Sequence, residues 1–419
     1  MDDSSSTDGN HDYIDIESLM KFIAVYCSFQ MQQNSQLSLK NLKNLVLIGG
    51  GHSHAIVLKL FGNQPVAGVN LTLITSDQYT PYSGMLPGHI AGFYNYSHCH
   101  IDLPNLSKFA NAQLYLDQVV GLNLENNQVF CANGTVVNFD IVSLDIGSTP
   151  AKLSVSGAAE YTIAAKPVKQ FLEHWYKLQN MVSENPQKPL SISIVGGGAG
   201  GVELALSMLA GLQKLGIENL TVHLWQRTGE LMPNHHPSVR GIMRDVVINK
   251  GVKLHLGENV CEVAPTRDNQ LEITSESGLK LKCNQVFWVT QASAANWVKD
   301  SGIATDEKGF ILVNDNLQSI SHPQIFAAGD IATMINYHLP KAGVFAVRQG
   351  KPLYENLRRL ILNKSLKPYK PQKEYLSLIG TGDGRALATR GNFTLPPHQL
   401  LWHGKDCIDR RFMAQFRHD

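Results

Sequence analysis

Two segments of the chain share one succession of apolar residues and glycines. The apolar run 44–48 (NLVLI) leads into Gly49-Gly50-Gly51, and the run 190–195 (LSISIV) leads into Gly196-Gly197-Gly198. A short apolar run bounded by glycine is typical of a parallel strand that is buried on both faces. Behind each glycine turn, the apolar residues follow the spacing of a helix. The pattern therefore predicts two strand–turn–helix units.

A second apolar segment follows each unit, at 69–74 and at 220–225. Strand, helix and strand in this order form a parallel βαβ unit. Two further strand-and-turn segments, 139–148 and 325–330, lie outside these units. Because the succession occurs twice, the sequence predicts an α/β fold with two Rossmann-like dinucleotide-binding domains, the second inserted in the first, and a small C-terminal α+β region.

The expected domain boundaries follow from these segments. The first nucleotide-binding domain is expected over 44–165 and 310–362, and the second over 166–309. Residues 363–419 are expected to form a hairpin and an amphipathic helix. Residues 1–43 are mostly polar, which predicts a disordered N-terminal tail.

Composition argues against several classes of protein. The 36 Lys and Arg residues nearly balance the 35 Asp and Glu residues without a basic stripe, so no nucleic-acid partner is expected. No apolar run approaches the ~20 residues that a membrane-spanning helix needs. The 6 cysteines are scattered without a C-x-x-C pair, so neither a metal site nor a redox dithiol is expected. Free thiols are typical of a reducing compartment, which favours a cytoplasmic location.

The second glycine turn carries a complete dinucleotide fingerprint, Gly196-x-Gly198-x-x-Gly201. Gly196 allows the tight turn, Gly198 leaves room for a diphosphate, and Gly201 lets helix and strand pack closely. The helix N-terminus offers unpaired N–H groups and a partial positive charge to the phosphates. This context favours dinucleotide binding over a purely structural turn.

The first fingerprint is less regular. Gly49 and Gly51 fit it, but His54 stands at the third position, where glycine or alanine is usual. The imidazole either widens the contact between helix and strand or lies near the diphosphate. We favour a packing role for His54 over a catalytic one, and the paired architecture still predicts nucleotide binding here.

The residues after each second strand bear on the choice of nucleotide, because a carboxylate there normally binds the adenine ribose. Thr75 and Ser76 occupy this place in the first domain, and Gln226 and Arg227 occupy it in the second. Arg227 is suited to a ribose 2′-phosphate, and a charged hydrogen bond contributes about 1.5–3 kcal/mol. NADPH is therefore slightly favoured over NADH, with a solvated surface arginine as the other interpretation.

Together these motifs resemble the flavoproteins with two dinucleotide-binding domains, the pyridine nucleotide-disulfide oxidoreductase superfamily. The resemblance implies FAD in the first domain and NAD(P)H in the second. It also implies that Gly329-Asp330, which closes the segment IFAAGD, contacts the ribityl and diphosphate groups of FAD. Gly147 lies in a turn similar to the first linker of the superfamily, although Asp145-Ile146 replace its usual residues. Thr290 lies in the second linker, where Gln291 replaces glycine.

Within the superfamily, the chain resembles the type II NADH dehydrogenase branch, and in particular the oxidoreductase module that some organisms fuse to selenide, water dikinase. The segments that carry this resemblance are GGGHSH (49–54), TPYSGMLPG (80–88), PKAGVFAVRQG (340–350) and KDCIDRRFM (405–413). The resemblance covers about residues 44–416 and includes no kinase domain, so no dikinase activity is expected.

The resemblance implies that NAD(P)H passes a hydride to FAD and that the electrons leave to a quinone or another small acceptor. Glu203 matches a glutamate near the nicotinamide–flavin contact, where it would assist proton or charge balance. A helix-start carboxylate is the alternative. Lys341, ahead of the helix that begins near Gly343, would stabilise the reduced flavin at its pyrimidine edge, and a surface lysine is the alternative.

Other reactions of the superfamily fit less well. Disulfide reduction and sulfide oxidation need cysteines beside the flavin, and the chain has none at the corresponding places. The two glutamines of the usual quinone site are replaced by Val344 and Arg348, so the acceptor stays open. These replacements, with the altered linkers, motivate a rival hypothesis: a flavin- and nicotinamide-binding redox sensor or regulatory module with little turnover, linked to selenium metabolism.

The C-terminal helix carries its own hypothesis. Leu401, Ile408, Phe412 and Phe416 are expected near one face, with Lys405 and the arginines elsewhere. Such a helix suits peripheral contact with a membrane, but a domain or homodimer interface would bury the same side chains. We favour packing over membrane contact.

Overall fold

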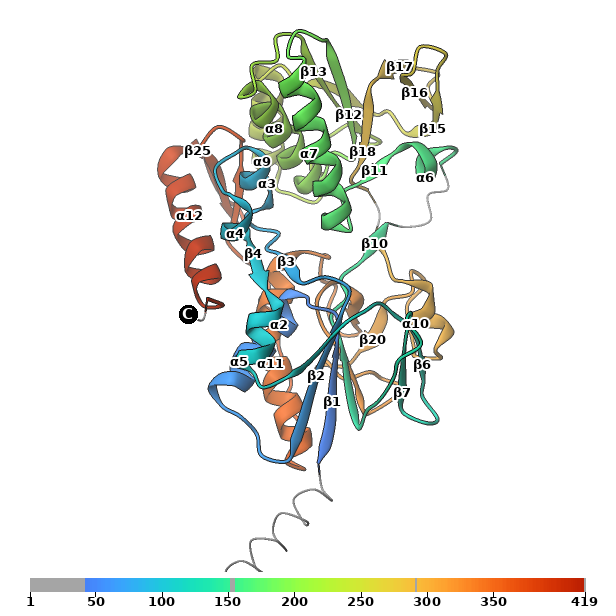
Figure 1. The fold of residues 1–419 in the computed structure, drawn as a ribbon. Coiled ribbons are helices and arrows are strands. Elements are labelled where there is room, and N and C mark those ends of the chain that lie inside the picture. The colour runs from blue at the N-terminus through green and yellow to red at the C-terminus, as the bar shows by residue number, and fades with distance from the viewer. Residues whose placement is uncertain (1–41, 151–154, 291, 418–419) are drawn as a thin grey trace, which may run out of the picture.

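The computed structural model describes residues 42–150, 155–290 and 292–417. Two five-stranded sheets form its two halves, one above the other in Figure 1. Every strand pair in both sheets is parallel. The first sheet has the order β21(Ile325–Ala327), β9(Ile141–Leu144), β1(Lys43–Ile48), β2(Val69–Thr75), β5(Gln113–Leu116). The second has the order β11(Ile163–Ala164), β18(Gln285–Trp288), β12(Leu190–Val195), β13(Leu220–Gln226), β14(Lys253–Leu256).

The two sheets repeat one arrangement. β1 and β12 are the central strands, and each leads through a glycine turn into a helix, α2(His52–Asn63) or α8(Ala199–Gln213). The next strand along the chain then pairs beside the central strand, in parallel and in full register. The predicted βαβ units and the α/β class are confirmed.

The chain leaves the first sheet and later returns to it. β21 pairs with β9, and all five strands of the second sheet lie between these two strands in sequence. The expected domain boundaries themselves stay predictions. Of the expected tail, residues 1–41 lie outside the described residues, and Lys43 already belongs to β1.

Smaller elements complete each half. One antiparallel sheet consists of β6(Val119–Asn123), β7(Gln128–Cys131) and β8(Val136–Asn138). A second consists of β15(Val260–Pro265), β16(Leu271–Ser275) and β17(Lys280–Cys283). Short strand pairs are β3(Tyr79–Pro81) with β4(His100–Asp102), β10(Thr149–Pro150) with β19(Ala292–Ser293), and β20(Ile311–Val313) with β22(Ala332–Met334). The remaining helices before residue 365 are α3(Leu86–Ile90), α4(Tyr96–Cys99), α5(Leu103–Phe109), α6(Ala158–Tyr161), α7(Val168–Glu184), α9(Pro237–Asn249), α10(Asn296–Asp300), the 3-10 turn η1(Gly329–Ile331) and α11(Gly343–Ile361).

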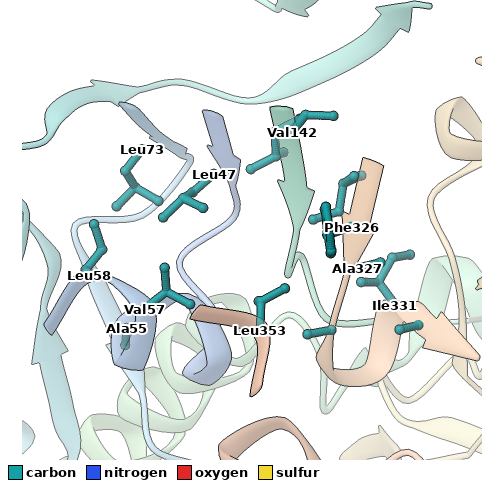
Figure 2. Close-up of a cluster of buried hydrophobic side chains, with 14 of the residues drawn as sticks. Leu47, Ala55, Val57, Leu58, Leu73, Val142, Phe326, Ala327, Ile331 and Leu353 are labelled. Atoms are coloured by element: carbon teal, nitrogen blue, oxygen red, sulfur yellow. The ribbon is translucent and has the colours of Figure 1, made fainter. Parts of the chain in front are cut away.

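The core of the first half lies between its sheet and two helices. Figure 2 shows side chains from the neighbouring strands β1, β9 and β21, represented by Leu47, Val142 and Phe326, in one layer. Leu58 of α2 and Leu353 of α11 lie beneath this layer, and all five side chains are fully buried. Burying each of them stabilises the fold by about 1.5–3 kcal/mol. This packing fixes the start of α2 against the carboxyl ends of the strands.

The C-terminal region is a three-stranded antiparallel sheet followed by a long helix. The strands are β23(Ser377–Gly380), β24(Ala386–Arg390) and β25(Phe393–His398), and the helix is α12(Gln399–Ala414). The expected hairpin therefore has one additional strand. In Figure 1 this region lies along the side of the upper half, and α12 reaches down towards the lower half.

The expected face of α12 is wrong in part. Ile408 is 53% exposed, whereas Lys405, expected on the polar side, is 7% exposed. Trp402, Asp409 and Met413 are buried along the same side of the helix as Lys405. An ion pair between Lys405 and Asp409 makes this possible, because each charge satisfies the other away from water. None of the helices in the described parts of the chain has the length and apolarity to cross a membrane.

Candidate active site

The first glycine turn connects β1 to α2 and packs against the end of β9. Gly49 has φ +90°, and a Cβ on it would lie 2.5 Å from the carbonyl oxygen of Asp145, at the end of β9. A Cβ on Gly51, the N-cap of α2, would lie 2.3 Å from the Asp145 carboxyl carbon. Side chains at either position would push the strand ends apart. The turn therefore requires glycine for close approach, as its fingerprint predicts.

His54 is fully buried behind this turn. Its Nδ1 lies 2.6 Å from the carbonyl oxygen of Gly49, and its Nε2 lies 2.9 Å from the hydroxyl of Ser143 in β9. Burial lowers the pKa of the imidazole to about 4, so the ring is neutral. The imidazole thus fills the contact between helix and strand, which agrees with a packing role.

Asp145 places a carboxylate at the start of α2. Its Oδ2 accepts a hydrogen bond of 3.1 Å from the backbone N–H of His54. Burial raises the pKa of this carboxyl to about 7, the bonds from His54 and Ser53 act in the opposite direction, and the charge of Asp330 raises it further. Sequence reasoning noted Asp145 only as a departure from the linker pattern. Its role as a partner of the helix N-terminus needed the fold.

The closing motif lies against the same turn. Gly329 has φ +71°, and a Cβ on it would lie 2.5 Å from Oδ1 of Asp145. The Asp330 carboxylate accepts hydrogen bonds from Lys166 Nζ at 2.6 Å and from the hydroxyl of Ser148 at 3.3 Å. The structure thus brings together the first turn, the first linker and the closing motif at the carboxyl edge of the first sheet.

The residues at the end of β2 and directly after it bond to each other. The Thr75 hydroxyl donates to the carbonyl of Asp77 at 3.3 Å, and the Ser76 hydroxyl donates to its carboxylate at 3.1 Å. The carboxylate of Asp77 also pairs with Lys169 of α7 at 2.9 Å. The first carboxylate after β2 is therefore that of Asp77, and it is paired with Lys169.

The second glycine turn has an open face. A Cβ on Gly201 would lie 1.8 Å from the carbonyl oxygen of Gly196, so this contact admits only glycine. Among the described residues, no atom beyond the two chain neighbours lies within 4 Å of a Cβ built on Gly198, the N-cap of α8. Thr290 borders the turn, since its Cγ2 lies 2.7 Å from a Cβ on Gly196. Space for a diphosphate thus remains at the start of α8.

The last residue of β13 and the residue that follows it differ in role. Gln226 is buried, and its Oε1 accepts a hydrogen bond of 3.0 Å from the backbone N–H of Gly197. Arg227, next to it, is exposed. Gln226 therefore holds the glycine turn through a hydrogen bond, and the next residue, Arg227, places a positive charge on the surface.

Glu203, in the first turns of α8, is held by the C-terminal region. Its Oε1 accepts a hydrogen bond of 2.7 Å from the backbone N–H of Gly380 in β23. Burial raises the pKa of this carboxyl, and the nearby charge of Lys405 acts in the opposite direction. The C-terminal sheet thus reaches the start of the second nucleotide-binding helix.

Sequence reasoning missed Lys405 and Asp409 of α12. Lys405 Nζ donates to the carbonyl of Gly84 and to Oδ2 of Asp409, the latter at 2.6 Å. The Tyr82 hydroxyl also bonds to Asp409, and burial together with this carboxylate raises the pKa of Tyr82. The opposite charges four residues apart were a signal, but such pairs usually lie on exposed helix faces.

Lys341 lies in a different environment from the one expected of a surface lysine. Its Nζ donates to the carbonyl of Ala332 at 2.6 Å and to the hydroxyl of Thr333 at 3.0 Å, and it lies 4.0 Å from the ring centroid of Phe310. Burial lowers the pKa of Lys341 to about 8. Gly343 begins α11, where a Cβ would lie 2.4 Å from the hydroxyl of Ser83.

Comparison with known proteins assigns these turns to a family. The model of the family described as pyridine nucleotide-disulphide oxidoreductase matches residues 43–350, well over half of the chain. The chain belongs to this family. The superfamily that its motifs resemble is thereby confirmed.

Relatives within the family point to one branch. Ferroptosis suppressor protein 1 of Homo sapiens is 26% identical over 278 residues, which cover 64% of this chain and 69% of the relative. The NADH dehydrogenase-like protein YutJ of Bacillus subtilis is 21% identical over 345 residues, or 81% of this chain and 90% of the relative. This agrees with the type II NADH dehydrogenase-like branch.

Solved structures share the fold. The sulfide:quinone oxidoreductase of Aquifex aeolicus matches with a TM-score of 0.74 at 17% identity, covering 90% of this chain and 91% of the other. NDH2 from Plasmodium falciparum, in complex with RYL-552, matches with a TM-score of 0.74 at 14% identity, covering 90% and 97%. At such identities the likeness concerns the fold alone.

The cofactors of this oxidoreductase are FAD and NAD(P)H. The residues present fit two dinucleotides. At the second turn, no described atom beyond the chain neighbours lies within 4 Å of a Cβ on Gly198, and the same holds for Gly147 in the first linker. At the first turn itself, Asp145 lies against the Cβ positions of Gly49 and Gly51. A buried nitrogen of His52, at the start of α2, also lacks a partner in the described part of the chain.

Proposed function

We propose that the protein is an NAD(P)H dehydrogenase that passes a hydride from NAD(P)H to FAD and then electrons to a quinone or another small acceptor. One observation carries the proposal: two glycine turns open two helices at the carboxyl edges of two parallel sheets, in a chain of this family. Ligands of doubly wound folds bind at this edge, and helix N-termini bind diphosphates.

The flavin supplies the redox chemistry when bound, because it accepts a hydride and releases electrons. The chain supplies position and charge. In this proposal, Gly49 and Gly51 with Asp330 hold FAD, and Gly196, Gly198 and Gly201 hold NAD(P)H. Gln226 and Thr290 border the second turn, Gly329 lies against Asp145 beside the first, and Gly147 is proposed to leave room for FAD at the first linker.

Glu203 is proposed to handle a proton or balance charge where the two cofactors meet. Its carboxyl is buried, its pKa is raised by that burial, and the N–H of Gly380 fixes its orientation. A carboxyl with a raised pKa holds a proton more readily than an ordinary glutamate, which suits it to proton exchange. Lys405 belongs to the same environment, because its charge acts on Glu203.

A quinone acceptor is supported by the branch and by likeness of fold to a sulfide:quinone oxidoreductase. The residues at the usual glutamine positions differ, since Val344 and Arg348 lie there. Arg348 donates a hydrogen bond to Gln372. The acceptor site therefore needs ligands other than the family's glutamines, and acceptor identity is the open part of the proposal.

The outer surface of the C-terminal region supports peripheral membrane contact. An apolar groove runs between its sheet and α12, lined by Leu376, Phe393, Leu395, Leu400, Leu401 and Ile408, among others. Leu400 is 72% exposed and Phe393 is 64% exposed. Exposed apolar patches mark membrane or protein contacts, so we propose that this groove faces a membrane interface in a cytoplasmic protein. Contact with a second copy is the alternative.

Anaerobic reduction tests the function. NADH and NADPH are added in parallel to purified protein, and we expect the flavin absorbance to be bleached and then restored by a quinone. Exposed Arg227 predicts that NADPH acts at least as well as NADH. A protein that neither contains nor takes up flavin would contradict the proposal.

The sensor hypothesis has a distinct outcome in the same experiment. The altered linkers and the replaced quinone glutamines favour it, since each departs from the catalytic members. If NAD(P)H reduces the flavin but quinones, ferricyanide and selenium compounds all fail to reoxidise it with turnover, the protein is a sensor or regulatory module.

A further inference from the structure

His52 is the first residue of α2 and follows the first glycine turn directly. Its imidazole lies edge-on to the ring of Tyr82, with centroids 5.5 Å apart, and 6.5 Å from the ring of Phe412 in α12. Tyr82 and Phe412 also pack on each other at 4.5 Å. Two aromatic rings, one from the C-terminal helix, therefore fix the imidazole at the start of the helix.

The Nε2 atom of His52 is buried and has no hydrogen-bond partner among the described residues. The carbonyl of Pro81 accepts a hydrogen bond from the ring, which leaves Nε2 as the free nitrogen. Buried polar atoms are paired in the great majority of cases, and an unpaired one indicates a partner that is a water or a ligand.

The chemistry of the ring restricts that partner. Burial lowers the pKa of His52 to about 4, so the imidazole is neutral, and a ring that donates from one nitrogen accepts at the other. Nε2 therefore accepts a hydrogen bond. A phosphate oxygen also only accepts, so it cannot be the partner, whereas a hydroxyl can donate.

The charges around the ring belong to the candidate flavin site. Asp330 and Lys166, which form an ion pair of 2.6 Å, are the two charged groups that act on His52. Asp330 follows the glycine of the closing motif beside the first turn. His52 therefore lies close enough to Asp330 and Lys166 to be affected by their charges, beside the residues proposed to hold FAD.

We propose that Nε2 of His52 accepts a hydrogen bond from a ribityl hydroxyl of bound FAD. This inference rests on the proposed function, because it assigns FAD to the first domain. It makes His52 a flavin-binding residue at a fingerprint position that carries no role in the sequence pattern. Through Phe412, it also connects the C-terminal helix to the flavin.

Binding of FAD to the full-length apoprotein tests the inference. FAD and its 2′-, 3′- and 4′-deoxyribityl analogues are titrated into native protein and His52→Phe, with flavin fluorescence as the readout. Loss of one neutral hydrogen bond is expected to weaken FAD binding about three- to tenfold in His52→Phe. One deoxy analogue should weaken binding to native protein to a similar degree and cause no further loss in the variant.

Controls separate the outcomes. His174→Phe changes an exposed histidine of α7 and should bind FAD as the native protein does. His52→Gln keeps an acceptor and should recover part of the affinity, which matters if His52→Phe folds poorly by circular dichroism. Equal FAD affinity in native protein, His52→Phe and His52→Gln would overturn the inference. If native protein fails to bind FAD at all, the proposed function fails as well.

Discussion

At the scale of single residues, the site depends on close approaches that leave no room for a Cβ. The contact between Gly196 and Gly201 is the tightest of them. The neighbouring Gly200 is unconstrained, since among the described residues outside its own helix a Cβ there would meet only Val289, at 3.9 Å. Gly200 and Gly201, both at the start of α8, therefore form a matched pair. Comparing their alanine variants separates the effect of breaking the fingerprint contact from the general effect of replacing a glycine.

We expect Gly201→Ala to weaken NAD(P)H binding and leave FAD content unchanged. The added Cβ would lie 1.8 Å from the carbonyl of Gly196, so β12 and α8 must separate. Such overpacking costs about 1–3 kcal/mol, or roughly tenfold in affinity. Stopped-flow titration of flavin reduction against NADPH measures it. Gly200→Ala is the control, and equal behaviour of the two variants would contradict the assigned role of Gly201.

Asp145 gives a prediction about pH. Its folded pKa of about 7 lies above the usual 3.8, so between these values the folded apoprotein holds a proton that the unfolded chain has lost. Stability from this group is therefore full below about pH 4 and is lost as pH rises towards 7. The contribution to the slope is at most about 1.4 kcal/mol per pH unit.

Asp145→Asn removes this titration. As the pH rises from 5 to 8, we expect the native apoprotein to lose stability that the variant keeps. The unfolding free energy of the variant should therefore increase relative to that of the native apoprotein. The neutral histidines His52 and His54 titrate in both proteins and cancel in the difference. Urea unfolding at each pH measures it, and a constant difference across this range would show that Asp145 ionises normally.

At the scale of elements, α12 is bound to the rest of the molecule by a buried ion pair. Lys405 and Asp409 are almost fully buried, and Lys405 also reaches the carbonyl of Gly84. One residue further along the helix, Arg410 and Asp406 form the same i,i+4 pair at 2.8 Å on a more exposed side. One helix thus offers a buried and an exposed pair of the same spacing.

We expect Lys405→Met to destabilise the protein by about 3–5 kcal/mol, because it leaves Asp409 as an unpaired buried charge. Arg410→Met should cost at most about 1 kcal/mol, as for exposed pairs. The double variant Lys405→Met with Asp409→Leu should recover much of the loss. Chemical unfolding of all three variants measures this, and a double variant no more stable than Lys405→Met would argue against the ion pair as the cause.

At the scale of the whole molecule, two similar halves are joined by the C-terminal region. In Figure 1, α12 lies beside both halves, with the C-terminal sheet against the upper one. β23 contacts the start of α8 through Gly380 and Glu203, and Phe412 contacts the start of α2 through His52. The region therefore touches both nucleotide-binding helices and presents its apolar groove outwards.

The groove predicts binding to lipid vesicles. Leu400→Ser with Ile408→Ser removes two exposed apolar side chains, each contributing about 1.5–3 kcal/mol when buried. We expect at least roughly tenfold weaker sedimentation with phospholipid vesicles, and unchanged thermal stability, because neither side chain is buried in the fold. Ser97→Ala, which changes an exposed side chain of α4, is a suitable control. Unchanged vesicle binding with a shift from dimer to monomer would instead indicate an interface between two copies.

Much of this protein followed from its sequence alone. The apolar runs, glycine spacing and closing motif determined two βαβ units and the place of both turns, since strand burial and close backbone approach impose local residue requirements. Tertiary structure alone decided how His54, Asp145, His52 and Lys405 are used. Each acts on a partner far away in sequence. His54 contacts Ser143, Asp145 binds the start of α2, His52 packs on Tyr82 and Phe412, and Lys405 donates to Gly84. Burial and pairing of polar groups depend on which helices and strands pack against each other, and this packing cannot be read from the spacing of residues within one segment.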